Sequence, residues 1–157
     1  YALSTRDTGS DDGYSRLDLF YRGYLHPVLL DADNFNTQVR LGYGNDYDAD
    51  VDAYAIGSAK TLRGYDSDDV KGDVMVLVNM EYLVPAPRRQ ALRGVIFADA
   101  GNAFATSEVD LADLKYAAGL GLRWKVRSLV RTDLRIDAAW NFDEEDYKIY
   151  AGTRHAF

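Results

Sequence analysis

The sequence of 157 residues has no cysteine, only three prolines, and no run of eighteen apolar residues. Without cysteine, the chain can form neither a disulfide nor a thiolate metal or redox site. Without a long apolar run, it cannot cross a membrane as a helix. Positive charge is also in deficit, since the net charge is −7. Nucleic acid is therefore not expected among its partners.

Residue patterns that carry catalysis are lacking as well. No serine lies in a nucleophile elbow, and no phosphate-binding loop is present. The acidic series Asp46, Asp48, Asp50 and Asp52 could coordinate calcium through its oxygens, but an EF-hand would need glycine and glutamate where Val51 and Gly57 stand. A solvated loop explains this series better. We expect no enzymatic activity, no metal site and no cofactor.

Aromatic residues, in contrast, are abundant, and tyrosine is twice as frequent as phenylalanine, with 12 against 6. Tyrosine suits a surface that is apolar on one side and wet on the other. The scarcity of proline suits long strand ladders. A soluble β-sandwich could have the same composition, so the hydrophobic period has to separate the two architectures.

Residues 128–142 alternate strictly between apolar and polar side chains. One face of this segment carries Thr132, Leu134, Ile136, Ala138, Trp140 and Phe142, and the other carries Arg131, Asp133, Arg135, Asp137, Ala139 and Asn141. The alternation persists over about eleven residues, which is the length that a tilted strand needs to cross a bilayer. Charges of both signs on the second face suit a wet barrel interior, whereas a sandwich would pack its apolar face against a core.

The same pattern recurs along the chain and predicts an all-β fold, an antiparallel transmembrane β-barrel meander of eight strands in one domain, residues 1–157. The expected strands are residues 1–8, 15–26, 35–46, 73–85, 92–104, 114–126, 128–142 and 147–157. The longest connection, 47–72, falls on the external side if both termini are periplasmic, as in other outer-membrane barrels.

Eight strands alone make a barrel whose interior is filled by side chains. Many inward positions of this chain are Gly or Ala, and the connection 47–72 is long. We therefore expect the strands to form half of a sixteen-strand barrel, completed either by a missing half or by a second copy in a homodimer.

Three short motifs follow one another in the sequence. Leu62-Arg63-Gly64-Tyr65 lies in the long connection, Glu81 lies in the next strand, and Phe97-Ala98-Asp99-Ala100-Gly101 lies in the strand after it. In this order they resemble the loop tip, the strand glutamate and the FxDxG motif of the BamA/TamA superfamily of outer-membrane assembly barrels. The resemblance covers residues 14–157 and corresponds to the C-terminal eight strands of that family. The periplasmic POTRA domains that usually precede the barrel are not expected in this chain.

The charges of these motifs suggest a contact inside the barrel. Glu81 and Asp99 are both expected to point inward, and a long loop could fold back to place Arg63 between them. A guanidinium fork matches carboxylates bidentately, which lysine would not reproduce. Gly64 would allow a tight turn, and Gly101 would leave space for the loop backbone. The resemblance implies the same contact. The alternative is a solvated loop arginine with two ordinary interior charges.

The last segment resembles a C-terminal β-signal, the terminal aromatic strand that assembly machinery of this family recognises. Tyr147, Ile149, Ala151 and the terminal Phe157 would form its lipid face, although Thr153 and His155 are unusual at their positions. An ordinary final strand is the alternative.

Three functions remain open. The resemblance implies an outer-membrane protein that takes part in the assembly, insertion or translocation of client β-barrel proteins. The second hypothesis is a structural barrel that dimerises as a membrane anchor or export pore for a fused passenger, as in patatin-like proteins. The third is a soluble binding module. The first two imply the bacterial outer membrane, with its lipid and lipopolysaccharide as partners.

Overall fold

The structure is a computed structural model that describes residues 2–5, 15–26, 28–30, 32–45, 53–66, 70–87, 89–126 and 132–153. Phe157 and the acidic series Asp46 to Asp52 lie outside the described residues. Ten strands are assigned in the described part: β1 (Ala2–Thr5), β2 (Ser15–Leu25), β3 (Asn34–Asn45), β4 (Tyr54–Ile56), β5 (Val70–Gly72), β6 (Val74–Ala86), β7 (Arg89–Phe104), β8 (Lys115–Val126), β9 (Thr132–Asn141) and β10 (Asp146–Thr153). A short 3-10 turn, η1 (Leu111–Asp113), precedes β8.

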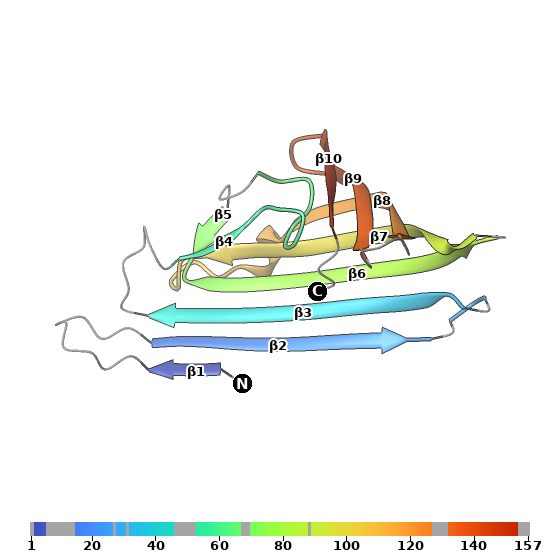
Figure 1. The fold of residues 1–157 in the computed structure, drawn as a ribbon. Coiled ribbons are helices and arrows are strands. Elements are labelled where there is room, and N and C mark those ends of the chain that lie inside the picture. The colour runs from blue at the N-terminus through green and yellow to red at the C-terminus, as the bar shows by residue number, and fades with distance from the viewer. Residues whose placement is uncertain are drawn as a thin grey trace.

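Eight of the strands form one antiparallel sheet in the order β1-β2-β3-β6-β7-β8-β9-β10. Apart from the inserted β4–β5 hairpin, each strand pairs with its neighbour in sequence, which is a meander. The sheet curves, so that β9 and β10 stand steeply to β2 and β3 in Figure 1. Within the described residues, β1 and β10 are the two ends of the sheet and do not pair with each other. The expected all-β antiparallel architecture is confirmed.

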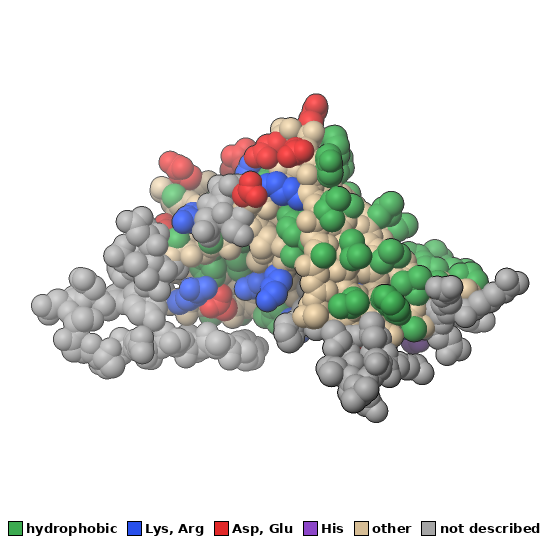
Figure 2. All heavy atoms as spheres, turned by 45° about the horizontal axis from the view of Figure 1, so that its top comes forward, with side chains coloured by type: hydrophobic (Ala, Val, Ile, Leu, Met, Phe, Trp, Pro, Cys, Tyr) green, Lys and Arg blue, Asp and Glu red, His purple; other side chains and the backbone are tan. Residues whose placement is uncertain are grey.

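The two faces of the sheet differ in chemistry, as the alternation predicts. The inner face, defined here as the face that carries Glu81 and Asp99, buries polar and charged side chains together with apolar ones on β6 to β9. The outer face is apolar and exposed, and Figure 2 shows hydrophobic side chains spread over it. Its large exposed residues include Leu17, Leu19, Leu41, Ile96, Leu120, Leu122, Trp124, Ile136, Trp140, Tyr147 and Ile149. A contiguous apolar surface of this kind is unusual on a soluble monomer and typical of a membrane-facing sheet.

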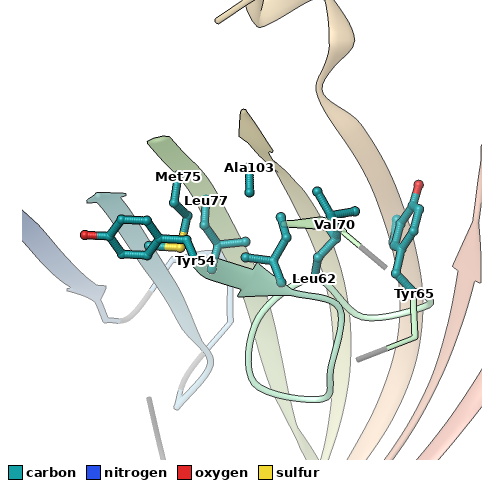
Figure 3. Close-up of a cluster of buried hydrophobic side chains, with 9 residues drawn as sticks. Tyr54, Leu62, Tyr65, Val70, Met75, Leu77 and Ala103 are labelled. Atoms are coloured by element: carbon teal, nitrogen blue, oxygen red, sulfur yellow. The ribbon is translucent and has the colours of Figure 1, made fainter. Parts of the chain in front are cut away.

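The connection between β3 and β6 is not the irregular loop that the sequence predicts, because it contains the β4–β5 hairpin. This connection lies against the inner face of β6, β7 and β8, where its apolar residues form a buried cluster (Figure 3). The cluster consists of Tyr54, Ile56, Leu62, Tyr65, Val70, Met75, Leu77, Ala103 and Ala117. Gly42 on β3 makes room for it, since a Cβ there would lie 2.3 Å from the Tyr54 ring.

No described helix is long and apolar enough to span a membrane.

Candidate functional site

The site is centred on the Arg63 loop, defined as residues 57–66. Its first half is a compact turn: the Gly57 amide donates to the Thr61 hydroxyl at 3.1 Å, and the Ser58 amide donates to the Leu62 carbonyl at 3.1 Å. Gly57 has a φ of +121°, which an L side chain rarely adopts. The turn presents Leu62 and Arg63 to the sheet as fully buried side chains.

Arg63 lies between the two carboxylates. Its Nε and Nη2 donate to the two oxygens of Asp99, each at 2.6 Å, and its Nη1 donates to Glu81 Oε1 at 2.6 Å. Its guanidinium carbon also stacks 3.6 Å from the centre of the Phe97 ring. This arrangement uses the planar fork of arginine and the face of an aromatic ring together.

Burial lowers the pKa of Arg63, but the hydrogen bonds and charges of Asp99 and Glu81 outweigh it. The pKa is therefore raised above its ordinary value, and the guanidinium stays charged although its side chain is 1% exposed. A buried charge is tolerated only when it is paired and hydrogen-bonded in this way.

Asn79 on β6 connects the loop backbone to the same carboxylate. Its Nδ2 donates to the Thr61 carbonyl at 2.7 Å and to Asp99 Oδ1 at 2.8 Å. Its Oδ1 accepts from Gln38 Nε2 of β3 at 3.2 Å. The loop is thus held by its backbone as well as by the arginine, and β3, β6 and β7 all contribute.

A second set of charges extends the site to β8 and β9. Arg123 Nη2 donates to Glu81 Oε1 at 2.9 Å, and its Nη1 donates to Asp137 Oδ1. Asp137 also accepts from Arg135 Nε at 2.9 Å, and Arg135 Nη2 reaches the loop carbonyl of Ala59 at 3.1 Å. Three guanidiniums (Arg63, Arg123, Arg135) balance three carboxylates (Glu81, Asp99, Asp137), so the network carries no net charge.

Two glycines of β8 provide the space for this network. A Cβ at Gly121 would lie 2.1 Å from Asp137 Oδ1, and one at Gly119 would lie 2.4 Å from the Phe97 ring. The sequence predicts this type of role for a different glycine, Gly101, next to the loop backbone. In the structure a Cβ at Gly101 would first meet β6, with Val76 O at 2.8 Å and the Leu77 side chain at 2.9 Å.

The tip of the loop, Gly64 and Tyr65, contacts the last three strands. Gly64 has a φ of +93°, as the expected tight turn requires, and its carbonyl accepts from Asn141 Nδ2 of β9 at 3.4 Å. The Tyr65 hydroxyl donates to the Tyr116 carbonyl of β8 at 3.1 Å. Burial, with the nearby charge of Asp143, raises the pKa of Tyr65 above its ordinary value.

The sequence matches the model of the Omp85 superfamily domain over residues 3–154, which is nearly the whole chain. This chain belongs to the Omp85 superfamily. Its members are outer-membrane proteins of protein assembly and translocation, and the resemblance to BamA and TamA barrels stated above is confirmed at this level.

Among solved structures, the Omp85 chain is similar to BamA from Haemophilus ducreyi lacking POTRA domains 1–3, with a TM-score of 0.73 and 18% sequence identity. The alignment covers 93% of this chain and 36% of that chain, so the present sequence spans about a third of the BamA structure. No curated protein matches the sequence.

In this Omp85 domain the structure brings together Arg63, Glu81 and Asp99, with Phe97 stacked on the arginine. Leu62 and Tyr65 lie in the buried apolar cluster beside them, and Gly64 contacts Asn141. Tyr147, Ile149 and Ala151 are exposed on the outer face of β10. Phe157, the fourth residue of the predicted β-signal, lies outside the described residues. Among the described residues, no group of three His, Cys, Asp or Glu side chains is arranged to hold a metal ion.

The part of the site that lies on β8, β9 and β10 was not predicted. Alternation put Asp137 on the inward face, but it gave no sign that Asp137, Arg123 or Tyr150 belongs to the site around the loop and Glu81. The available signal was the pair of inward glycines at 119 and 121, which mark positions where larger side chains of neighbouring strands need space.

Proposed function

We propose that this chain is the membrane-embedded part of a BamA/TamA-type outer-membrane protein that inserts or translocates other proteins. Residues 1–157 would form one barrel domain, located in the bacterial outer membrane. The exposed apolar outer face would contact lipid and lipopolysaccharide, and the polar inner face would line the interior.

The observation that carries the proposal is the anchored Arg63 loop. A loop that lies against the inner face of β6 to β8 and is fixed there by three buried guanidinium–carboxylate hydrogen bonds would obstruct an open pore. It suits a barrel in which client proteins contact the strands of the wall and do not pass through the lumen. Within the described residues β10 is one end of the sheet, and an unpaired edge of this strand would accept a client strand by augmentation.

The C-terminal strand has a separate role in this proposal. Tyr147, Ile149 and Ala151 expose an alternating apolar row on β10, and with Phe157 they would serve as the β-signal by which the chain itself is recognised for insertion. The same residues would face lipid afterwards, so one pattern serves both recognition and anchoring.

A second candidate is favoured by the open sheet. Eight strands curve without closing on themselves in the described residues, and the chain spans 36% of the BamA structure that it resembles. A second copy could supply the missing strands and complete a homodimeric barrel. Such a barrel would act as an anchor or export pore for a fused passenger.

Refolding the full-length gene product into detergent, followed by electrophoresis with and without boiling, tests the membrane barrel. We expect a heat-modifiable band. A protein that stays soluble and monomeric without detergent would contradict the proposal. Mass measurement of the protein–detergent complex then separates a monomer from a homodimer.

Insertion is tested by incubating liposomes that contain the protein with an unfolded client barrel and following the protease-protected client. We expect faster insertion than in empty liposomes, and slower insertion with Arg63→Ala than with the matched loop variant Lys60→Ala, because Lys60 is exposed. A wild-type protein that inserts the client no faster than empty liposomes would reject the assembly role and leave the anchor.

A further inference from the structure

Tyr150 connects the last strand of the sheet to the tip of the Arg63 loop. Its hydroxyl accepts a hydrogen bond from the Gly64 amide at 2.9 Å and donates one to the Tyr65 carbonyl at 3.3 Å. Its ring packs against the second buried cluster, made of Leu83, Val95, Phe97 and Ala139. The Tyr150 hydroxyl of β10 is therefore both an acceptor from and a donor to the loop backbone.

This contact matters because β10 lies at one end of the sheet. In the described residues it pairs only with β9, and its opposite edge is the end of the sheet. Lys148 Nζ of β10 also lies 2.7 Å from Asp66 Oδ2 of the loop. Asp66 is mostly exposed, and ion pairs at exposed sites contribute little to stability. The hydroxyl of Tyr150 bonds to the backbone of Gly64 and Tyr65, which are both buried residues, and a hydrogen bond lost at a buried group costs more than one lost at the surface.

We propose that Tyr150 is a positioning residue that couples the Arg63 loop to the edge strand β10. When the arginine holds the loop against Glu81 and Asp99, the loop tip holds Tyr150, and Tyr150 keeps β10 paired with β9. Release of the loop loosens β10. The coupling would control the strand at the edge where a client strand pairs, and this role rests on the proposed function. The coupling itself does not depend on that function.

The coupling is reciprocal, because two sites that stabilise one another do so by the same free energy. Loss of the Tyr150 hydroxyl should therefore loosen both partners, β10 and the loop tip. It should leave the pairing of β6 with β7 unchanged, since Arg63, Asn79 and Asp99 keep all of their contacts.

Amide hydrogen exchange of the full-length protein in detergent micelles tests the proposal. Tyr150→Phe keeps the ring in the apolar cluster and removes only the hydroxyl. Tyr147→Phe is the matched control, because Tyr147 is on the same strand with its side chain exposed on the outer face. We expect Tyr150→Phe to speed exchange about tenfold in residues 146–153 and 62–66, given two lost hydrogen bonds of ordinary strength. Equal exchange in the two variants, or a uniform increase over the sheet, would overturn the proposal.

A double-variant comparison separates coupling from a merely local effect. Arg63→Ala should by itself speed exchange in residues 146–153, and adding Tyr150→Phe to it should have little further effect, because the loop tip has already left. If the two effects multiply, Tyr150 acts independently of the loop and the proposal is wrong. Should the double variant not fold, the comparison of Tyr150→Phe with Tyr147→Phe still decides. These measurements need only the folded protein, so failure of the insertion assay would leave their result intact.

Discussion

Arg63 and Arg123 share a single oxygen atom of Glu81. Oε1 accepts from Arg63 Nη1 at 2.6 Å and from Arg123 Nη2 at 2.9 Å, and all three side chains are buried. Glu81 therefore links two groups of charges: Arg63 with Asp99 of β7, and Arg123 of β8 with Asp137 of β9. Loss of its charge would leave two buried guanidiniums facing one another with one counter-charge fewer.

Glu81→Gln should destabilise the protein strongly. Removing one partner of a buried ion pair typically costs about 3–5 kcal/mol, because the remaining charge stays buried without compensation. Chemical unfolding in detergent, followed by tryptophan fluorescence, measures this cost. The matched control is Glu108→Gln, since Glu108 is exposed between β7 and β8 and the change should stay within about 0.5 kcal/mol. A similar small effect at both sites would mean that the network contributes nothing.

Arg63→Lys should release the loop although it conserves the charge. Lysine cannot make the two parallel bonds to Asp99 and stacks less well on Phe97. Limited proteolysis should cut residues 57–66 at least several-fold faster in Arg63→Lys than in the wild type, and faster still in Arg63→Ala. Lys60→Ala, in the same loop, should retain the wild-type rate. Wild-type protection in Arg63→Lys would show that charge alone holds the loop.

Gly121→Ala should damage the network from the opposite strand. The new methyl group would lie 2.1 Å from Asp137 Oδ1, so either the carboxylate or β8 has to shift. Overpacking of this kind costs about 1–3 kcal/mol. Gly94→Ala is the control, because a Cβ at Gly94 meets nothing within 4 Å, and it should be neutral or slightly stabilising. Unfolding midpoints of the two variants give the comparison, and no difference between them would count against the packing seen here.

Asp33, in the turn before β3, should make stability depend on pH. Burial raises the pKa of its carboxyl, but hydrogen bonds from the Tyr82 hydroxyl and from the amides of Val28, Leu29 and Leu30 outweigh it and hold the pKa well below its usual range. Such a group stabilises the fold above its unfolded pKa, about 4, and this stability is lost as the pH falls toward the folded pKa.

Unfolding free energies between pH 6 and pH 3 measure this contribution. The wild type should lose stability more steeply below about pH 4 than Asp33→Asn, which has no carboxyl to titrate. Parallel curves for the two proteins would exclude Asp33 as a source of the pH dependence.

The strands could be predicted from the sequence because each side of the sheet has a uniform environment. Leu134, Ile136 and Trp140 face outward and Asp137 and Asn141 face inward, as period 2 requires. The β4–β5 hairpin could not be predicted, since strands of three residues are too short to display a period. Its position depends on apolar contacts with β6 to β8 that are distant in sequence.

The second half of the site depends on register, which alternation does not provide. Arg123 lies directly opposite Arg135 in the β8–β9 pairing, a like-charge pair that would be unfavourable by itself. Asp137, opposite Gly121, accepts from both arginines and resolves the conflict. The contact between Arg63 and Asp99 could be predicted with preference only from the resemblance to a family. The two residues are 36 positions apart, and the residues alone left open that either side chain is solvated.

The exchange rate of the Arg63 Nε–H in the folded protein tests the loop anchor most directly, because that proton is donated to Asp99 in a buried site. Selective ¹⁵N labelling of arginine and transfer of the detergent-folded protein into D₂O would report it by NMR. The Arg63 signal should persist long after the signals of exposed arginines have vanished, and Asp99→Asn should shorten its lifetime sharply. An Arg63 signal that disappears together with those of the exposed arginines would contradict the account.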